Sequence, residues 1–164
     1  YLSHKRGAKK IYSYEPEISN FEILEFNCRV LNAEAYNWAV VGDNRHVIKL
    51  YTGDRGDIHS LFNKHTTSSY QLCGCINFND VLKIHEPQIV KIDIEGGEYE
   101  IFKNVEKVPD TIEELIIELH LGAFKEWRMV LAPSLVDKIK KLGFEMRKAP
   151  TFKGYTNVIS CIRE

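Results

Sequence analysis

The sequence predicts an α/β fold in which a mostly parallel sheet carries helices on both faces. Stretches with the period of a β-strand alternate along the chain with stretches of helical spacing, an order that is typical of parallel sheets. The last two expected strands are joined by a short connection, so we expect them to form an antiparallel pair. The chain has 164 residues and no internal repeat, which fits a single domain over 1–164.

The N-terminal half is expected to contain three strands and one amphipathic helix. Polar and apolar residues alternate at 10–14, which indicates a strand. Pro16 suits the first turn of a helix, and apolar residues recur behind it at helical spacing. A short apolar run that ends in Gly42-Asp43-Asn44 indicates a buried strand followed by a turn. In this half we expect strands at 10–14, 38–41 and 46–52, a helix at 17–32 and an exposed loop at 53–69.

The C-terminal half alternates strands and helices more regularly. The apolar runs IVKIDI and IEELIIEL have the composition of buried strands. Apolar residues at helical spacing precede Gly143, which is expected to cap the last helix. In this half we expect strands at 72–78, 89–94, 112–119, 144–147 and 157–162, and helices at 79–85, 99–105 and 135–142.

Composition and charge narrow the classes of function. Lys and Arg number 22 against 23 Asp and Glu, whereas a broad nucleic-acid surface needs a basic excess, so we expect no nucleic-acid partner. No apolar run reaches the ~18 residues of a membrane span and no signal peptide is visible, so we expect no membrane partner. The four cysteines are expected to be reduced thiols in a cytoplasmic protein.

Acidic residues follow several expected strands, where open α/β sheets bind their ligands. Glu15 ends the first expected strand, and its carboxylate could accept hydrogen bonds from the two hydroxyls of a ribose. NAD enzymes and methyltransferases share this position, so Glu15 does not distinguish them. The alternative is a carboxylate that caps the following helix at the positive end of its dipole.

The segment KIDIEGGEYEIF at 91–102 is the most informative stretch of the chain. Asp93, Glu95 and Glu98 fall within six residues at the end of an apolar strand, and two glycines between them permit a sharp turn. Such acids could bind a cofactor's amino group, accept a proton from a hydroxyl or hold a cation. The alternative is a capping turn with solvated acids, and the spacing alone leaves both open.

The same segment closely resembles the signature of FkbM-type methyltransferases. Three other stretches resemble that family in order and spacing: GAKKIYSYEPEISNFEILEFN at 7–27, CINFNDVL at 75–82 and ELIIELH at 114–120. Asn77 and Asn79 depart from the family's usual Thr and Asp. The resemblance implies a Rossmann-like methyltransferase fold, S-adenosylmethionine as cofactor, and methyl transfer to a hydroxyl of a sugar or other small-molecule acceptor.

By position, the resemblance implies a role for each acidic site. The cofactor side would comprise Glu15 and Pro16 at the ribose, Asp43 near the adenine and Asp93 near the methyl group. The acceptor side would comprise Glu95, Glu98, Glu118 and His120. Either Asp93 or His120 would act as the base, and the alternative for His120 is a hydrogen bond to a carbonyl. A cation among the acids is an alternative, but no metal is predicted.

One feature of the family is not visible in the sequence. The family's first strand and its glycine loop should precede the stretch at Tyr1, so we expect the methyltransferase domain to be incomplete at its N-terminus. A non-catalytic methyltransferase-like binding module is therefore the rival interpretation. An NAD enzyme and a nucleic-acid methyltransferase are weaker alternatives.

Overall fold

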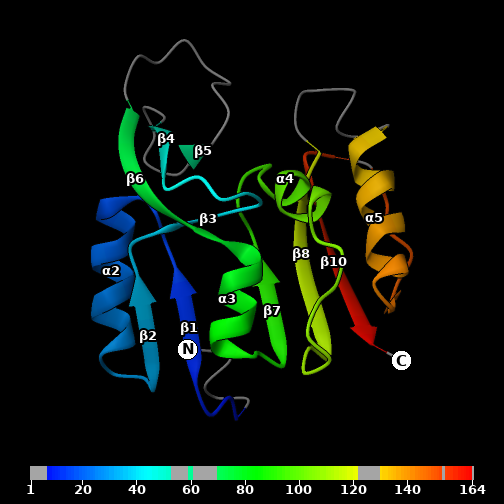
Figure 1. Cartoon of the computed structure of the whole chain (residues 1–164), viewed down its shortest axis with the longest axis horizontal. Coiled ribbons are helices and arrows are strands. Elements are labelled where there is room, and N and C mark those ends of the chain that lie inside the picture. The colour runs from blue at the N-terminus through cyan, green and yellow to red at the C-terminus, as the bar shows by residue number, and fades with distance from the viewer. Residues whose placement is uncertain (1–6, 53–58, 61–69, 122–129, 153, 164) are drawn as a thin grey trace.

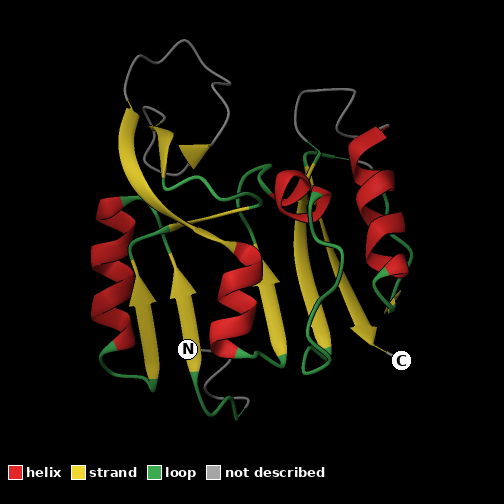
Figure 2. Cartoon of the chain, viewed as in Figure 1, coloured by secondary structure: helices red, strands yellow, loops and turns green. Residues whose placement is uncertain are grey.

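The computed structural model describes residues 7–52, 59–60, 70–121, 130–152 and 154–163. Helices and strands alternate in a mixed α/β architecture (Figures 1 and 2). The elements are β1 (Ile11–Tyr14), α2 (Ile18–Cys28), β2 (Ala33–Tyr36), β3 (Ala39–Val41), β4 (Val47–Thr52), β5 (His59–Ser60), β6 (Tyr70–Asn77), α3 (Phe78–His85), β7 (Ile89–Ile92), α4 (Glu98–Lys103), β8 (Glu114–His120), α5 (Ala132–Lys141), β9 (Phe144–Met146) and β10 (Thr156–Arg163).

The strands form three hydrogen-bonded groups in the described residues. These are β1–β2, β7–β8–β10–β9 and β3–β6–β4–β5. Figure 1 shows that β1, β2, β7 and β8 run in one direction, whereas β10 runs in the other. The carboxyl ends of the four co-directional strands therefore lie at one edge of the molecule, beside β3 and α4 (Figure 1).

The prediction of a mostly parallel sheet is wrong for the described residues. Parallel pairing is found in β1–β2, β3–β6 and β7–β8, while β4–β5, β4–β6, β8–β10 and β9–β10 are antiparallel. The difference arises because β4 folds back along β6 rather than joining the strands that precede it. The expected antiparallel pair at the C-terminus is confirmed by β9 and β10.

In the N-terminal half the expected helix and three strands are present, but the structure differs from the expectations in three details. The helix expected at 17–32 ends at Cys28, and the next four residues form a turn that leads into β2. The sequence of β2, AEAY, is too short and too rich in alanine to stand out as a strand, yet it pairs with β1 along its whole length. The loop expected at 53–69 contains β5, and its other residues lie outside the described part of the chain.

The core lies on one face of the β7–β8–β10–β9 sheet. In β8, Leu115, Ile117 and Leu119 are each 0% exposed and alternate with Ile116 and Glu118, which are partly exposed. The buried residues of β8 pack with apolar residues from α3, α4 and α5 in one cluster. Since alternate strand residues point to opposite faces, Glu118 projects away from this core.

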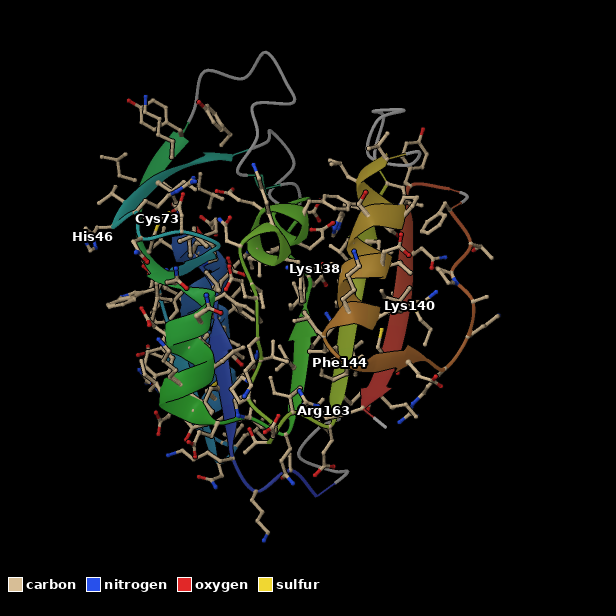
Figure 3. The ribbon with its side chains drawn as sticks, turned by 45° about the vertical axis from the view of Figure 1, so that its right-hand side comes forward. His46, Cys73, Lys138, Lys140, Phe144 and Arg163 are labelled. Carbon is tan, nitrogen blue, oxygen red and sulfur yellow. The ribbon has the colours of Figure 1, made fainter. Side chains whose placement is uncertain are left out.

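The C-terminal strand pair closes the end of the core. Arg163 of β10 places its Cζ 4.9 Å from the centroid of the Phe144 ring in β9 (Figure 3). Its Nη1 also donates to Asp110 Oδ1 at 2.8 Å. These contacts fix the last strand against the connection that precedes β8.

All four cysteines are buried free thiols. Burial raises the pKa of Cys75 to about 11, so this side chain stays a neutral thiol at physiological pH. Among the described residues, no helix has both the length and the apolar character needed to cross a membrane.

Gly42 permits a close approach between the turn after β3 and the backbone of α4. A Cβ atom at this position would overlap the backbone carbonyl of Glu100 and lie 2.9 Å from Ile101 Cα. The carbonyl of Gly42 also accepts a hydrogen bond from Asn104 Nδ2 at 3.0 Å. The turn after β3 therefore packs directly against the backbone of α4.

We expect Gly42→Ala to lower the free energy of unfolding by about 1–3 kcal/mol, because a methyl group forced against backbone must displace α4. Urea denaturation monitored by circular dichroism measures the change. Gly74→Ala is the matched control, since a Cβ atom there meets nothing within 4 Å. An equal loss of stability in both variants would show that the contact with α4 is not the cause.

Candidate functional site

A sharp turn joins β7 to α4 and positions the acidic residues of the KIDIEGGE segment. Glu95 and Gly96 have positive φ values of 52° and 101°. Positive φ is strained for a residue with a Cβ atom, at a cost of about 1–3 kcal/mol, so the surrounding structure must hold Glu95 in place. The sharp turn predicted from the two glycines is confirmed, and α4 begins at Glu98.

Glu98 connects this turn to the end of β8. Its side chain is 0% exposed. Oε1 accepts a hydrogen bond from the backbone N–H of His120 at 2.7 Å, and Oε2 accepts one from the backbone N–H of Gly96 at 2.8 Å. A buried carboxylate needs such donors, because an unpaired charge costs far more to bury than an unpaired neutral polar group. Glu98 is therefore a structural anchor rather than a residue exposed to the acceptor.

His120 lies between Glu98 and the acids of the turn. Its Nδ1 is 3.3 Å from Glu98 Oε1, and its Nε2 is 3.4 Å from Glu95 Oε1 and 3.9 Å from Asp93 Oδ1. Burial alone would lower the pKa of His120, but hydrogen bonds with Glu95 and Glu98 and their negative charges raise it to about 10. The imidazole therefore carries a proton at neutral pH when only these carboxylates face it.

Asp93 and Glu118 complete the group on the face of the sheet opposite the core. Asp93 is 40% exposed, and its Oδ2 accepts from Lys91 Nζ at 2.8 Å. One ligating atom from each of Asp93, Glu118 and His120 lies within 4.8 Å of the other two. We call Asp93, Glu95, Glu118 and His120 the β7–β8 cluster. Such a group of acids and one imidazole can accept a proton or hold a positively charged ligand.

Glu15 and Pro16 lie at the end of β1, as expected. Glu15 Oε1 accepts from the backbone N–H of Glu17 at 2.8 Å. Glu17 itself caps α2, because its Oε2 accepts from the backbone N–H of Asn20 at 2.7 Å. The capping role that was the alternative for Glu15 thus belongs mainly to Glu17.

Asn37 was not identified from the sequence, although it holds the segment after β1 in place. Its Nδ2 donates to the carbonyl oxygens of Glu15 and Pro16 at 2.9 and 3.1 Å. Asn37 directly follows β2, so recognising that strand in the sequence would have pointed to this residue.

Asp43 follows β3 and pairs with a cation. Its Oδ1 accepts from Arg45 Nε at 2.7 Å, and Arg45 also pairs with Glu100 of α4. The hydrogen bond from Arg45 holds the pKa of Asp43 below its usual range. Because β3 pairs with β6, the strand that follows β1 in the parallel pair is β2 rather than β3. The assignment of Asp43 to the adenine remains a prediction.

Acidic side chains at the carboxyl ends of parallel strands are typical of α/β enzymes. The chain belongs to the methyltransferase FkbM domain family, whose family model matches residues 1–146. This membership supports methyltransferase activity and confirms the resemblance seen in the KIDIEGGE segment. The chain has no significant match among curated proteins or among solved structures.

Proposed function

We propose that this protein is an S-adenosylmethionine-dependent methyltransferase with a Rossmann-like fold that acts on a hydroxyl of a sugar or other small molecule. The observation that carries the proposal is the β7–β8 cluster, which lies at the carboxyl ends of two parallel strands in a chain of a methyltransferase family. The common direction of β1, β2, β7 and β8 supports the fold assignment (Figure 1).

The residues after β1 fit the ribose of the cofactor. Glu15 is partly exposed, and the N–H of Glu17 fixes one of its carboxylate oxygens. Asn37 holds the neighbouring backbone through the carbonyls of Glu15 and Pro16. A carboxylate held in this way can accept hydrogen bonds from a vicinal diol. Asp43 or Asn37 would then lie toward the adenine.

The β7–β8 cluster fits the acceptor side. When bound, the cofactor supplies an electrophilic methyl group, and alignment of the acceptor with it can contribute about 7–11 kcal/mol. A hydroxyl is a weak nucleophile, so a group that takes its proton helps as the new bond forms. Both nitrogens of His120 already face carboxylates, whereas Asp93 is more exposed than His120. We therefore propose that Asp93 takes the proton of the acceptor hydroxyl and that His120 has a positioning role.

Cofactor binding is tested by calorimetric titration of S-adenosylhomocysteine into the longest natural form of the protein. We expect binding in the micromolar range, and Glu15→Ala should weaken it by about 10–150-fold, because each hydrogen bond to a charged group contributes about 1.5–3 kcal/mol. Glu22→Ala is the matched control, since Glu22 is exposed on α2.

The same titration decides between the alternatives. Binding that Glu15→Ala leaves unchanged would reject the ribose assignment. If the natural protein binds no S-adenosylhomocysteine, the non-catalytic binding module becomes the better explanation. Binding of NAD in its place would instead favour a dehydrogenase.

A further inference from the structure

We propose that Asp93, Glu118 and His120 bind a divalent metal cation at the carboxyl ends of β7 and β8. One ligating atom from each residue lies within 4.8 Å of the other two, and His120 Nε2 is 3.9 Å from Asp93 Oδ1. Ligand atoms at about 2.0–2.3 Å from one ion are about 3–4 Å apart when adjacent and about 4–4.6 Å apart when opposite. Side-chain rotations that bring the three atoms closer together would close them around an ion.

The backbone of the sheet sets the positions of these three ligands. Ile92, the last residue of β7, pairs with Ile117 of β8, so Asp93 directly after β7 lies next to Glu118 within β8. Glu118 and His120 are two residues apart in β8 and project from the same face. Ligands carried by paired strands are held more rigidly than ligands carried by loops.

The contacts around the ligands orient them toward a common point. Glu98, which is 0% exposed, lies 3.3 Å from His120 Nδ1 and accepts from the His120 backbone N–H. A carboxylate on one nitrogen of a histidine is the usual second partner of a metal-binding imidazole, because it fixes the ring. The other nitrogen, Nε2, faces Glu95 Oε1 at 3.4 Å, so a metal ion would take the place of that contact. Lys91 similarly holds Oδ2 of Asp93, while Oδ1 faces His120.

The type of ligand indicates the class of cation. Two carboxylates and one imidazole, without a thiolate, suit Mn²⁺ and similar divalent ions better than Cu⁺. Three protein ligands leave positions open for water or another oxygen ligand. The binding of the cation does not rest on the proposed function. Its use in polarising the acceptor hydroxyl does, and would replace proton transfer to Asp93, because Asp93 would then be a metal ligand.

The test is a titration of Mn²⁺ into the natural protein without cofactor. The electron paramagnetic resonance signal of free Mn²⁺ measures how much of the ion is bound. We expect one Mn²⁺ per chain, with affinity reduced at least tenfold in Asp93→Asn and in Glu118→Gln. Glu113→Gln is the matched control, because Glu113 is exposed and its carboxylate bonds Gln88. Circular dichroism of each variant verifies that it is folded.

Three results would overturn the proposal: no Mn²⁺ binding, affinity unchanged in both cluster variants, or an equal loss in Glu113→Gln. Titration of S-adenosylhomocysteine on the same samples separates this proposal from the proposed function. Cofactor binding without Mn²⁺ binding rejects the metal site alone. Mn²⁺ binding without cofactor binding supports the metal site and rejects the methyltransferase assignment.

Discussion

Replacing Glu98 with alanine is expected to lower the free energy of unfolding by about 3–5 kcal/mol, the usual cost of removing one partner from a buried charged pair. The carboxylate is 0% exposed and accepts from the backbone N–H groups of Gly96 and His120, so its loss leaves both donors buried without an acceptor. The imidazole of His120 loses its partner at Nδ1 as well. Chemical denaturation of the purified variant measures this change.

The matched control for this variant is Glu106→Ala. Glu106 is an exposed glutamate shortly after α4, so its removal should change stability by no more than about 0.5 kcal/mol. The loss of stability in Glu98→Gln should lie between those of the two alanine variants. The amide oxygen can still accept one hydrogen bond, but the amide N–H groups face the second backbone donor and cannot accept from it. If Glu98→Ala were as stable as the control, the carboxylate would not be the anchor of the turn.

Asp93→Asn is expected to lower kcat for methyl transfer by about 10²–10⁴-fold, the usual contribution of a positioned acid or base. The described contacts of Asp93 are with Lys91 and with His120, which belongs to the proposed acceptor side. We therefore expect the affinity for S-adenosylhomocysteine to change much less than kcat. Rate measurements at saturating cofactor and acceptor, together with calorimetry, separate the two effects.

Asp80→Asn is the control for the rate measurement, since Asp80 is an exposed aspartate on α3 that pairs with Lys83. Turnover within about threefold of the natural protein in Asp93→Asn would reject a catalytic role for this carboxylate. Full turnover in His120→Ala with saturating acceptor would show that the imidazole is not needed as a base.

The parts of the fold that rest on local periodicity were predictable. The apolar composition of β8 and the helical spacing of apolar residues in α5 appear directly in the sequence. The mixture of parallel and antiparallel pairs was not predictable, because strand pairing depends on contacts between distant segments. The strand β2 was missed because alanines give little local preference, and pairing with β1 supplies its stability.

For the candidate site, the sequence by itself determined the acidic turn and its family. The spacing of Asp93, Glu95 and Glu98 around two glycines indicated a strand that ends in a sharp, acidic turn, and the family match agrees with it. Only the tertiary structure decided the burial and the partners of each carboxylate. Glu98 turns inward as a buried anchor, while Asp93 joins Glu118 and His120 on the opposite face. The reason is that burial and partner distance depend on how β7, α4 and β8 pack, and no local pattern in the chain encodes that geometry.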